Sequence, residues 1–487
     1  MSLIDQIQHL RNSLTDLYPE LFLIIFFLAT LVSELAISKN HTPETKFSRL
    51  LKLQWVGAFL LLALLAIQWT TTERGALFHN LLLLDSKAIF FKILVALTWV
   101  FALFHLQKLR YRFQPELLIL LASAVLGSLF LCMAANLLTV YLSMEVISLS
   151  SYLLIGLSPK AQASEGSLKY LLFGTVSSAI MLYGISFLYG LTGSLDLSAE
   201  AWSALMENDP YIITVTILLT FGGLLFKLSL IPFHVWTPDT YEAGPTPIIS
   251  FLSTAPKIAV LLALSRLLSA LPEAAAPILG GIALISMTVG NTGALWQQNA
   301  KRLLAYSTIA QAGYLMVGLV SVNQTGFETG VFYLVAYAFL SMSAFLLADL
   351  FSPRSDLNFA HFNGKGSAWT IGGVALTFVM VALAGLPPTI GFTGKWLIFS
   401  SLWESYRAAG NTWMLVLLVG GILNAAISLA YYLKLPFLLF FKKDENGAEA
   451  QAGWATPVNS IVALFILCVV IGLFLQPQLL TGLIHRL

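Results

Sequence analysis

Charged residues are scarce in this chain of 487 residues: only 10% are Asp, Glu, Lys or Arg, whereas 58% are hydrophobic. A soluble domain carries roughly 25% charged residues, so this composition cannot supply a water-facing surface. The near balance of 26 basic and 24 acidic residues, with no basic cluster, argues against a nucleic-acid partner. The composition therefore predicts a polytopic protein whose main surroundings are the lipid bilayer.

Motifs for metals, nucleotides and haem are also missing. The two cysteines, Cys132 and Cys468, lie far apart in apolar segments and form no metal or iron–sulfur spacing. The Gly-Lys pairs at 364–365 and 394–395 lack the upstream glycine and the Ser or Thr of a phosphate-binding loop. There is no dinucleotide fingerprint and no helix pair with haem-binding histidines. We expect no bound cofactor and no metal on this chain, and hence no redox chemistry of its own.

Long apolar runs fill most of the chain, and a membrane-spanning helix needs about 20 such residues. Helices are expected because each span must satisfy its own backbone groups in lipid. Basic residues concentrate in alternate loops, as at Lys46, Arg49, Lys301 and Arg302, which predicts that both termini lie on the outer side. We predict about fourteen spans, at 20–38, 50–70, 87–106, 115–134, 136–157, 163–192, 211–231, 244–270, 276–297, 301–322, 328–351, 367–402, 413–441 and 457–475.

A faint internal repeat links the two halves of the chain. "EVISLSSYLLIGL" (145–157) resembles "STIAQAGYLMVGL" (307–319), and "KYLL" (169–172) and "FYLV" (332–335) follow at nearly the same separation. Five predicted spans lead from the first copy to the second, so the copies would have opposite topology. Inverted repeats with broken helices are typical of transporters whose site lies near mid-membrane.

After the charges assigned to loops and span boundaries are set aside, ten charged residues remain to be explained. Glu34, Lys92, Arg266 and Asp349 lie near span ends, where we expect them to snorkel or to face headgroups. The others lie deeper and should face the bundle interior or water, because a charge at a helix centre costs about 2.5–3.5 kcal/mol. These are Glu145, Lys169, Lys227, Lys257, Lys395 and Lys434.

Two spans contain helix-breaking residues next to a lysine. Lys227 follows 16 uncharged residues and precedes Pro232. "LAGLPPTIGFTGKW" (383–396) places Pro387 and Pro388 before Lys395. A proline within a span frees a backbone carbonyl one turn earlier and bends or breaks the helix. Water or a lysine ammonium can bind such carbonyls, so the pattern predicts two discontinuous helices, the seventh and the twelfth.

Glu145 is the only acid well inside a span, and we expect it to pair with Lys227 directly or through one water. A pair whose separation changes would control whether the lysine holds or releases its proton, which is one way to move protons. The alternative is a static ion pair that fixes helix packing. The number of lysines in the spans favours proton or cation conduction.

Two further residues keep both interpretations open. Lys434, in "YYLKLPF", could belong to the relay or could reach the inside edge of its span. His234, in "PFHVWTP", could load protons from the cytoplasm, since an imidazole titrates near neutral pH, or could pack a loop. Trp236, Pro238 and Asp239 indicate a structured re-entrant connection and not a catalytic set.

Five segments resemble one family closely: "SMEVISLSSYLLIG" (143–156), "GSLKYLLFG" (166–174), "FKLSLIPFHVWTPDTYEAGPTPIISFLSTAPKIA" (226–259), "KRLLAYSTIAQAGYLMVGL" (301–319) and "LAGLPPTIGFTGKW" (383–396). The chain resembles the subunit N family of bacterial respiratory complex I, the NADH:quinone oxidoreductase, from about residue 85 to 475. The mitochondrial counterpart is chain 2. Complex I is a proton-translocating enzyme, and this family forms part of its membrane arm.

The resemblance implies an all-α membrane fold with two inverted five-helix repeats. It divides the chain into N-terminal helices at 1–114, a first repeat at 115–270, a second at 276–441 and a last helix within 442–487. By position it implies a proton relay of Glu145, Lys169, Lys227, Lys257 and Lys395, one each on helices 5, 6, 7, 8 and 12.

The resemblance also implies partners and a location. The neighbours would be other membrane-arm subunits, of the K and M types, in the bacterial inner membrane, and partner subunits would bind FMN, iron–sulfur clusters, NADH and quinone. The main alternative is a chain of a Mrp-type cation/proton antiporter, which shares the antiporter-like plan. A scaffold subunit without conduction is a third possibility.

Overall fold

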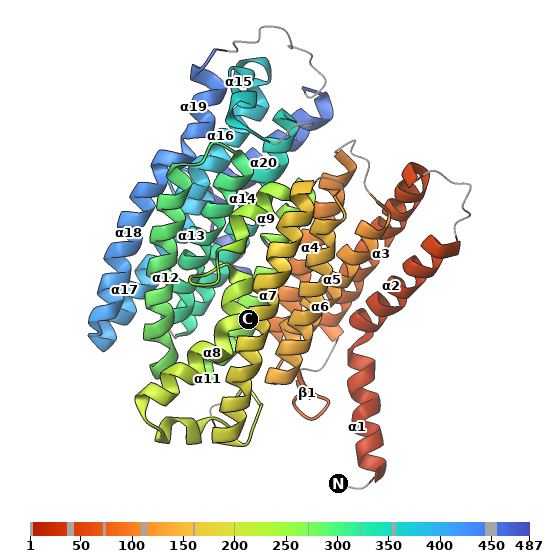
Figure 1. The fold of residues 1–487 in the computed structure, drawn as a ribbon, viewed down its shortest axis with the longest axis vertical. Coiled ribbons are helices and arrows are strands. Elements are labelled where there is room, and N and C mark those ends of the chain that lie inside the picture. Colours follow the sequence, from red (N-terminus) through yellow and green to blue (C-terminus); the bar gives the residue numbers. More distant parts are fainter. Residues whose placement is uncertain are drawn as a thin grey trace. The chain divides into compact units, whose positions relative to one another are not determined.

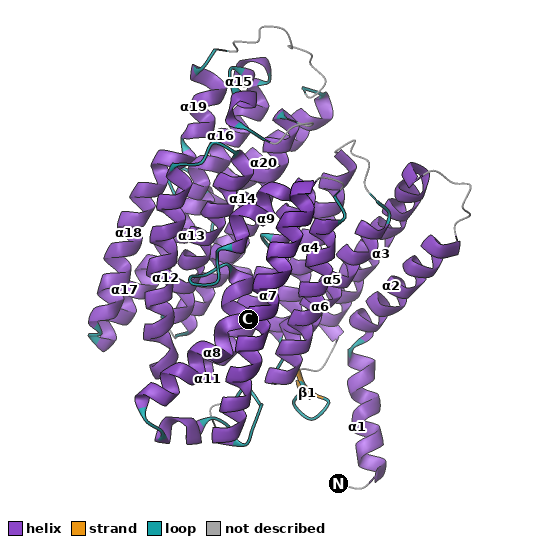
Figure 2. Cartoon of the chain, in the orientation of Figure 1, coloured by secondary structure: helices purple, strands orange, loops and turns teal. Residues whose placement is uncertain are grey.

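Helices make up nearly all of the chain that the structure describes, as Figures 1 and 2 show. The structure is a computed structural model, and it describes residues 3–36, 43–71, 75–108, 114–158, 161–198, 200–270, 272–321, 323–352, 357–443 and 455–487. Thirteen helices among these residues are long and apolar enough to cross a membrane. This confirms the predicted class, an all-α polytopic membrane protein.

The contacts divide the chain into two units. Unit 1 consists of residues 1–228 and 243–271 with Leu487, and unit 2 consists of residues 229–242 and 272–486. The short segment 229–242, which directly follows the span of Lys227, thus packs with the second half of the chain. The division at 271/272 falls between the predicted repeats, whose inverted relation stays a prediction.

Unit 1 is built from packed helix pairs and one small hairpin. α2 packs on α3, α3 on α4, α5 on α6, α6 on α7 and α7 on α8, while α11 packs on α4, α5 and α8. The strands β1 and β2 pair antiparallel, with Ala76 opposite Leu83. The bounds are α1 Leu3–Asp16, α2 Tyr18–Ala36, α3 Pro43–Thr71, β1 Gly75–Leu77, β2 Leu82–Leu84, α4 Ser86–Lys108, α5 Glu116–Met133, α6 Leu137–Gly156, α7 Ala161–Thr192, η1 Ser203–Glu207, α8 Pro210–Leu228, α10 Thr246–Leu252 and α11 Ala255–Ala270.

At the centre of unit 2 are α13 and α14, two helices that are buried along almost their whole length. α13 packs on α12, α14 and α17, and α14 also packs on α16, α20 and α21. The bounds are α9 Trp236–Ala243, whose last residue falls in unit 1, α12 Pro272–Leu295, α13 Ala300–Val320, α14 Gln324–Phe351, η2 Phe359–Phe362, α15 Lys365–Ala368, α16 Thr370–Ala384, α17 Ile390–Ala409, α18 Thr412–Tyr432, α19 Lys434–Phe441, α20 Pro457–Leu475 and α21 Gln478–Ile484.

The two predicted helix breaks are confirmed. α8 ends at Leu228, before Pro232, and the next helix, α9, begins at Trp236. The predicted span 367–402 consists of α16 and α17, which are separated at residues 385–389 around Pro387 and Pro388. α16 has 15 residues and is shorter than the thirteen candidate spans. The one predicted span that is missing from these thirteen, 367–402, is therefore the interrupted one.

One break was not predicted. The span expected at 244–270 contains two helices, α10 and α11, with a turn at Ser253 and Thr254 between them. No glycine stands at this turn to mark it. Its effect is to start α11 at Ala255, two residues before Lys257, so that this lysine lies in the first turn of a new helix.

Candidate functional site

Lys227 is buried in an aromatic pocket of unit 1, one residue before the end of α8. Its side chain is 2% exposed. Its Nζ donates to the Tyr170 hydroxyl at 3.0 Å and lies 5.1 Å from the centre of that ring and 5.5 Å from the ring of Tyr152. An ammonium within about 6 Å of an aromatic face is attracted to it, most strongly where water is excluded. The pocket therefore holds the charge of Lys227 with aromatic faces and a hydroxyl.

The direct ion pair expected between Glu145 and Lys227 is not what the structure shows for these two described residues. Glu145, on α6, accepts a hydrogen bond from the Ser178 hydroxyl of α7. Lys227 donates to Tyr170 instead. Tyr152 lies seven residues after Glu145, on the same face of α6, and contacts the Lys227 side. The water-separated form of the pair stays a prediction.

The broken end of α8 is bound by the second predicted lysine. Lys257 is 1% exposed, and its Nζ donates to the Leu228 carbonyl at 2.9 Å. The last carbonyls of a helix have no partner within the helix and carry a partial negative charge, which favours a cation there. Lys257 therefore caps the C-terminal end of α8, although it lies 29 residues after Leu228 in the sequence.

His234 lies in the segment between α8 and α9, which belongs to unit 2. In the same segment the backbone N–H of Ile231 donates to the Ser286 hydroxyl of α12 at 3.0 Å. The imidazole is about half-buried, and burial lowers the pKa of His234 from its ordinary value. A neutral imidazole is therefore the favoured form at neutral pH.

Lys395 binds the broken end of α16 as Lys257 binds that of α8. Its Nζ donates to the carbonyl of Ala384 at 2.8 Å and to that of Leu383 at 3.2 Å, and it lies 4.4 Å from the centre of the Tyr314 ring. The helix ends at Ala384, and the next residue, Gly385, has a φ of 89°, which is strained for any residue with a side chain. A Cβ at Gly385 would also lie 2.6 Å from Cδ of Lys395. The glycine thus allows both the sharp helix end and the close approach of the lysine.

The tyrosines of the two repeated sequence segments occupy matching surroundings. Tyr152 lies 5.5 Å from Nζ of Lys227 in unit 1, and Tyr314 lies 4.4 Å from Nζ of Lys395 in unit 2. Each also meets a second tyrosine edge-on, from the "KYLL" or the "FYLV" segment. These are Tyr170 at 4.6 Å and Tyr333 at 6.3 Å between ring centres. Each unit therefore holds a lysine against a pair of tyrosines.

A chain of buried hydrogen bonds continues from the Lys395 site within unit 2. Gln311 Nε2 donates to the Leu383 carbonyl and to the Tyr432 hydroxyl, both at 2.9 Å. The Tyr333 hydroxyl donates to Oε1 of the same glutamine. Leu383 thus accepts from both Lys395 and Gln311, which joins the lysine to a line of hydroxyl groups. Sequence analysis did not identify Gln311, although "TIAQAGY" places this amide three residues before Tyr314.

Lys434 caps a third helix end. Its Nζ donates to the carbonyls of Leu295, the last residue of α12, and of Gln297 at 3.3 Å. Its side chain is only partly buried. These contacts favour a structural role at the edge of the unit over a place in the relay.

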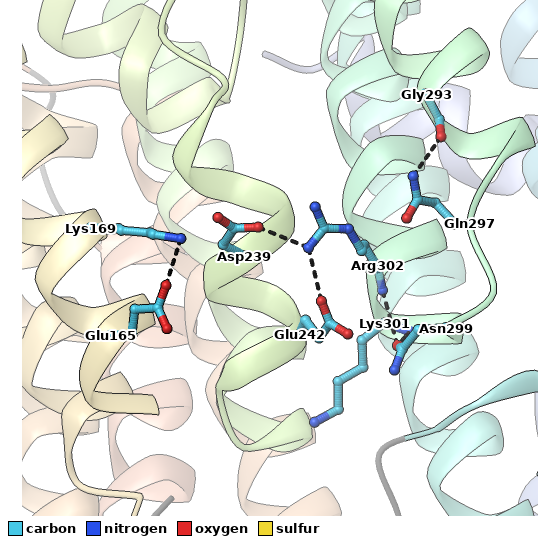
Figure 3. A network of polar contacts seen from close by, with 9 residues as sticks. All are labelled: Glu165, Lys169, Asp239, Glu242, Gly293, Gln297, Asn299, Lys301 and Arg302. Carbon is cyan, nitrogen blue, oxygen red and sulfur yellow. Dashed lines mark hydrogen bonds and ion pairs between the residues drawn. The ribbon is translucent and has the colours of Figure 1, made fainter. Parts of the chain in front are cut away.

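The expectation that Lys169 faces the bundle interior is wrong. Its side chain is 40% exposed, and its Nζ lies 2.9 Å from Oε1 of Glu165, one turn earlier on α7 (Figure 3). α7 packs only part of its circumference, so spacing alone did not reveal which face Lys169 occupies. The contact that places Lys169 is therefore an ion pair within its own helix, on a partly exposed side chain.

An ion-pair cluster that sequence analysis missed ties the re-entrant segment to α13. Arg302 Nη1 lies 2.8 Å from Oδ1 of Asp239 and 2.9 Å from Oε2 of Glu242, both on α9 (Figure 3). In Figure 3 the guanidinium stands between the two carboxylates. The carboxylates are three residues apart, on one face of a helix, and this spacing is a signal that sequence analysis could have used. The cluster fixes the segment that carries His234.

Two of the four charges expected at span ends are buried. Lys92 is 0% exposed and pairs with Glu20, and Asp349 is 2% exposed. Arg266 is partly buried and bonds Asp85 at 3.0 Å. The expectation failed for Lys92 and Asp349 because neighbouring segments cover these side chains. A sequence divided into separate spans does not show which segments pack together.

No group of three or more His, Cys, Asp or Glu side chains among the described residues is placed to hold a metal ion. The model of one protein family matches residues 134–424, and it is described as "NADH:quinone oxidoreductase/Mrp antiporter, TM". A curated relative, NADH-quinone oxidoreductase subunit N 2 of Chloroherpeton thalassium, is 36% identical over 82% of this chain and 81% of the relative. The chain belongs to the subunit N family of NADH-quinone oxidoreductase.

Other relatives of this family agree along the whole chain. Subunit N of Chlorobium chlorochromatii is 33% identical over 96% of this chain and 94% of that protein. A chain of the respiratory complex I of Thermus thermophilus, solved with bound aureothin, is 30% identical, covers 95% of this chain and 98% of its own, and superposes with a TM-score of 0.79. The antiporter-like fold is therefore shared with complex I.

Proposed function

We propose that this chain moves protons across the membrane through Glu145, Lys227, Lys257 and Lys395, as a membrane-arm subunit of NADH:quinone oxidoreductase. The enzyme is a translocase, and electron transfer from NADH to quinone takes place in its partner subunits. We leave Lys169 of the predicted relay out of this proposal, because its side chain is 40% exposed and pairs with Glu165. Lys434 is left out because it caps α12.

The observation that carries this proposal is the pair of broken helices with a buried lysine at each end. Lys257 binds the end of α8 and Lys395 binds the end of α16. Each ammonium is held by backbone carbonyls and not by a carboxylate. A carbonyl cannot become charged, so a capping lysine can give up its proton without leaving an unpaired buried anion. This makes the two helix ends suitable positions for a mobile proton.

Within unit 1 the roles follow from the contacts. Lys227 would hold a proton in its aromatic pocket, and Glu145 would set how strongly, through its distance from the ammonium. The Tyr170 hydroxyl, which accepts from Lys227, can itself donate onward and so can pass a proton along a hydrogen-bonded line. Lys257 would receive the proton at the end of α8.

Entry and exit are assigned from the chain segments at the breaks. His234, neutral and half-buried between α8 and α9, would take up protons on the cytoplasmic side. Lys395 would be the outward end, because the gap at residues 385–389 leaves backbone groups able to bind water. We infer the two sides from the loops rich in Lys and Arg, which would face the cytoplasm and leave both termini on the outer face of the bacterial inner membrane.

The Mrp-type antiporter alternative shares the family model but is less well supported. The curated relatives described above are named as subunit N and match 82% and 96% of the chain. We therefore propose other complex I membrane-arm subunits, of the K and M types, as neighbours. FMN, iron–sulfur clusters, NADH and quinone would be bound by further subunits.

Purification of the chain from native membranes tests the assignment to complex I. NADH:quinone activity and peripheral iron–sulfur subunits should travel with it through mild solubilisation and size separation. Co-purification with small antiporter subunits, without NADH oxidation, would instead establish the Mrp-type alternative. Proton transport by the relay itself is tested by the variants described in the Discussion.

A further inference from the structure

The N-terminal helices of unit 1 contain a buried ion pair far in sequence from the relay. Lys92 of α4 and Glu20 of α2 are both 0% exposed, and Nζ lies 2.8 Å from Oε1 of the carboxylate. Nζ also donates to Oε1 of Gln68 on α3 at 2.7 Å and contacts Sδ of Met133 on α5 at 3.5 Å. Four helices thus meet at one ammonium group.

Half of the Glu20 carboxylate has no hydrogen-bond partner among the described residues. Its Oε1 accepts from Lys92, but Oε2 is buried and accepts from nothing in the protein. A carboxylate has acceptor sites on both oxygens, and leaving one of them unsatisfied in a buried place is destabilising. A proton on Oε2 or a bound water removes this cost, so the geometry marks Oε2 as a position for one or the other.

Other buried polar atoms without partners among the described residues lie on α3 and α4. Gln54 of α3 is 0% exposed, and neither its amide nitrogen nor its oxygen has a partner among the described residues. The indole Nε1 of Trp99 on α4 is in the same condition. Buried polar groups in proteins are nearly always bonded, if not to protein then to ordered water.

These atoms line up along the helices. Trp99 follows Lys92 by seven residues, which puts it on the same face of α4, about 10 Å further along. Gln54 precedes Gln68 by 14 residues, which puts it on nearly the same face of α3, about 21 Å away. The contact between Gln68 and Lys92 fixes the register of these packed helices. The polar atoms therefore run in one direction from the ion pair toward the other end of both helices.

We propose that Glu20 and Lys92 form a second proton-exchange site, reached by water that lies along Trp99 and Gln54. Oε2 of Glu20 takes up a proton from this water. Nζ of Lys92 releases the proton that it directs at the weakly accepting sulfur of Met133, to a water that replaces this contact. The pair is electrically neutral before and after, as carboxylate with ammonium or as carboxylic acid with amine. Gln68 holds Lys92 in place in both states through its side-chain oxygen.

Three other titratable groups lie close to this pair, and Cys132 is near enough to interact with both Glu20 and Lys92. Asp85 and Arg266 pair at 3.0 Å, and Cys132 on α5 is a buried thiol. Asp85 also accepts from the backbone N–H of Ala88 in the first turn of α4, at 2.6 Å. Arg266 lies on α11, nine residues after Lys257, so the two proton sites share packed helices within unit 1.

Water along this path can be tested in the native complex without any substitution. Radiolytic footprinting labels oxidisable side chains that lie next to bound water. Trp99 should be labelled at least severalfold more than Phe91, which is equally buried on the same helix but apolar. Equal, background labelling of the two rings would show a dry interior and overturn the proposal.

Proton exchange is tested by Lys92→Arg, with Lys46→Arg as the matched control. Arginine keeps the charge and the bonds to Glu20 and Gln68 but barely deprotonates. Lys46 of α3 lies 3.8 Å from Glu34 of α2, on two of the four helices that meet at Lys92, and is not buried in the bundle. In assembled complex in vesicles, Lys92→Arg should lower the proton-to-electron ratio, while Lys46→Arg leaves it unchanged. An unchanged ratio in Lys92→Arg would mean a static ion pair.

A spectroscopic measurement covers the case in which Lys92→Arg does not assemble. Infrared difference spectra of turning-over complex should contain a protonated-carboxyl band that Glu20→Gln removes and Glu34→Gln does not. A band that survives in Glu20→Gln would overturn the proposal. The inference rests on the proposed proton translocation by this chain, but the two proposals can fail independently. The Lys395 variants test the relay, and the measurements on Lys92, Glu20 and Trp99 test this site.

Discussion

Replacement of Lys257 by methionine should stop proton transfer at the end of α8 with only a small effect on stability. The ammonium is 1% exposed and its hydrogen bond to the Leu228 carbonyl is 2.9 Å long. Loss of a charge-assisted bond costs about 1.5–3 kcal/mol, whereas removal of a buried charge returns several kcal/mol of desolvation. Because these terms oppose each other, the free energy of unfolding should change by less than about 2 kcal/mol.

The assay compares assembly, thermal stability and the proton-to-electron ratio of purified complex in sealed vesicles. Lys365→Met is the matched control, since Lys365 also donates to the last carbonyl of a helix, that of Phe351 at 3.1 Å, but lies outside the relay. We expect both variants to assemble and only Lys257→Met to lose pumping. The reasoning is refuted if Lys257→Met pumps fully, or if both variants lose pumping alike, because helix capping alone would then explain the lysines.

Three further substitutions test separate parts of the site. Glu145→Ala should depress pumping more than assembly, and failure to assemble would indicate a static packing role. Gly385→Ala should impair pumping, because a left-handed residue with a side chain costs about 1–2 kcal/mol and its Cβ would displace Lys395 from a distance of 2.6 Å. Gly410→Ala has the same backbone penalty, at φ 69°, with nothing within 4 Å, so it should pump normally. The pKa of His234 is lowered in the folded chain, so just below the ordinary histidine pKa the unfolded chain binds more protons than the folded one. The free energy of unfolding should therefore fall as the pH drops through that range. His234→Gln should reduce this pH dependence in thermal melting curves, and an unchanged pH dependence would contradict the burial argument.

The features that local chemistry controls could be predicted from the sequence. Clusters of proline and glycine inside an apolar run weaken a helix locally, so the breaks near Pro232 and at Pro387–Pro388 were visible without a structure. The same holds for the burial of Lys227 and Lys395, because long uncharged runs surround them. The family relationship was also readable, since the motifs around these lysines are specific.

Features that depend on packing between distant segments could not be predicted. The capping of α8 by Lys257 joins residues 29 apart, and nothing local shows that an ammonium will meet that carbonyl. Lys169 was placed wrongly because an almost uniformly apolar helix has no polar face to show which side is buried. Lys92 was expected to reach water or headgroups because it stands near a span end, and Glu20 was overlooked for the same reason. Only the neighbouring helices reveal that both are fully covered.

The proton-to-electron ratio of a correctly assembled Lys395→Arg complex tests the central claim most directly. Arginine can keep the positive charge and the bonds to Leu383 and Ala384, but a guanidinium barely deprotonates. If Lys395 passes protons outward, the ratio should fall while electron transfer from NADH to quinone continues at least in part, and Lys395→Ala should behave alike. A full ratio in assembled Lys395→Arg complex would contradict this account and would place the exit elsewhere, in another residue or another subunit.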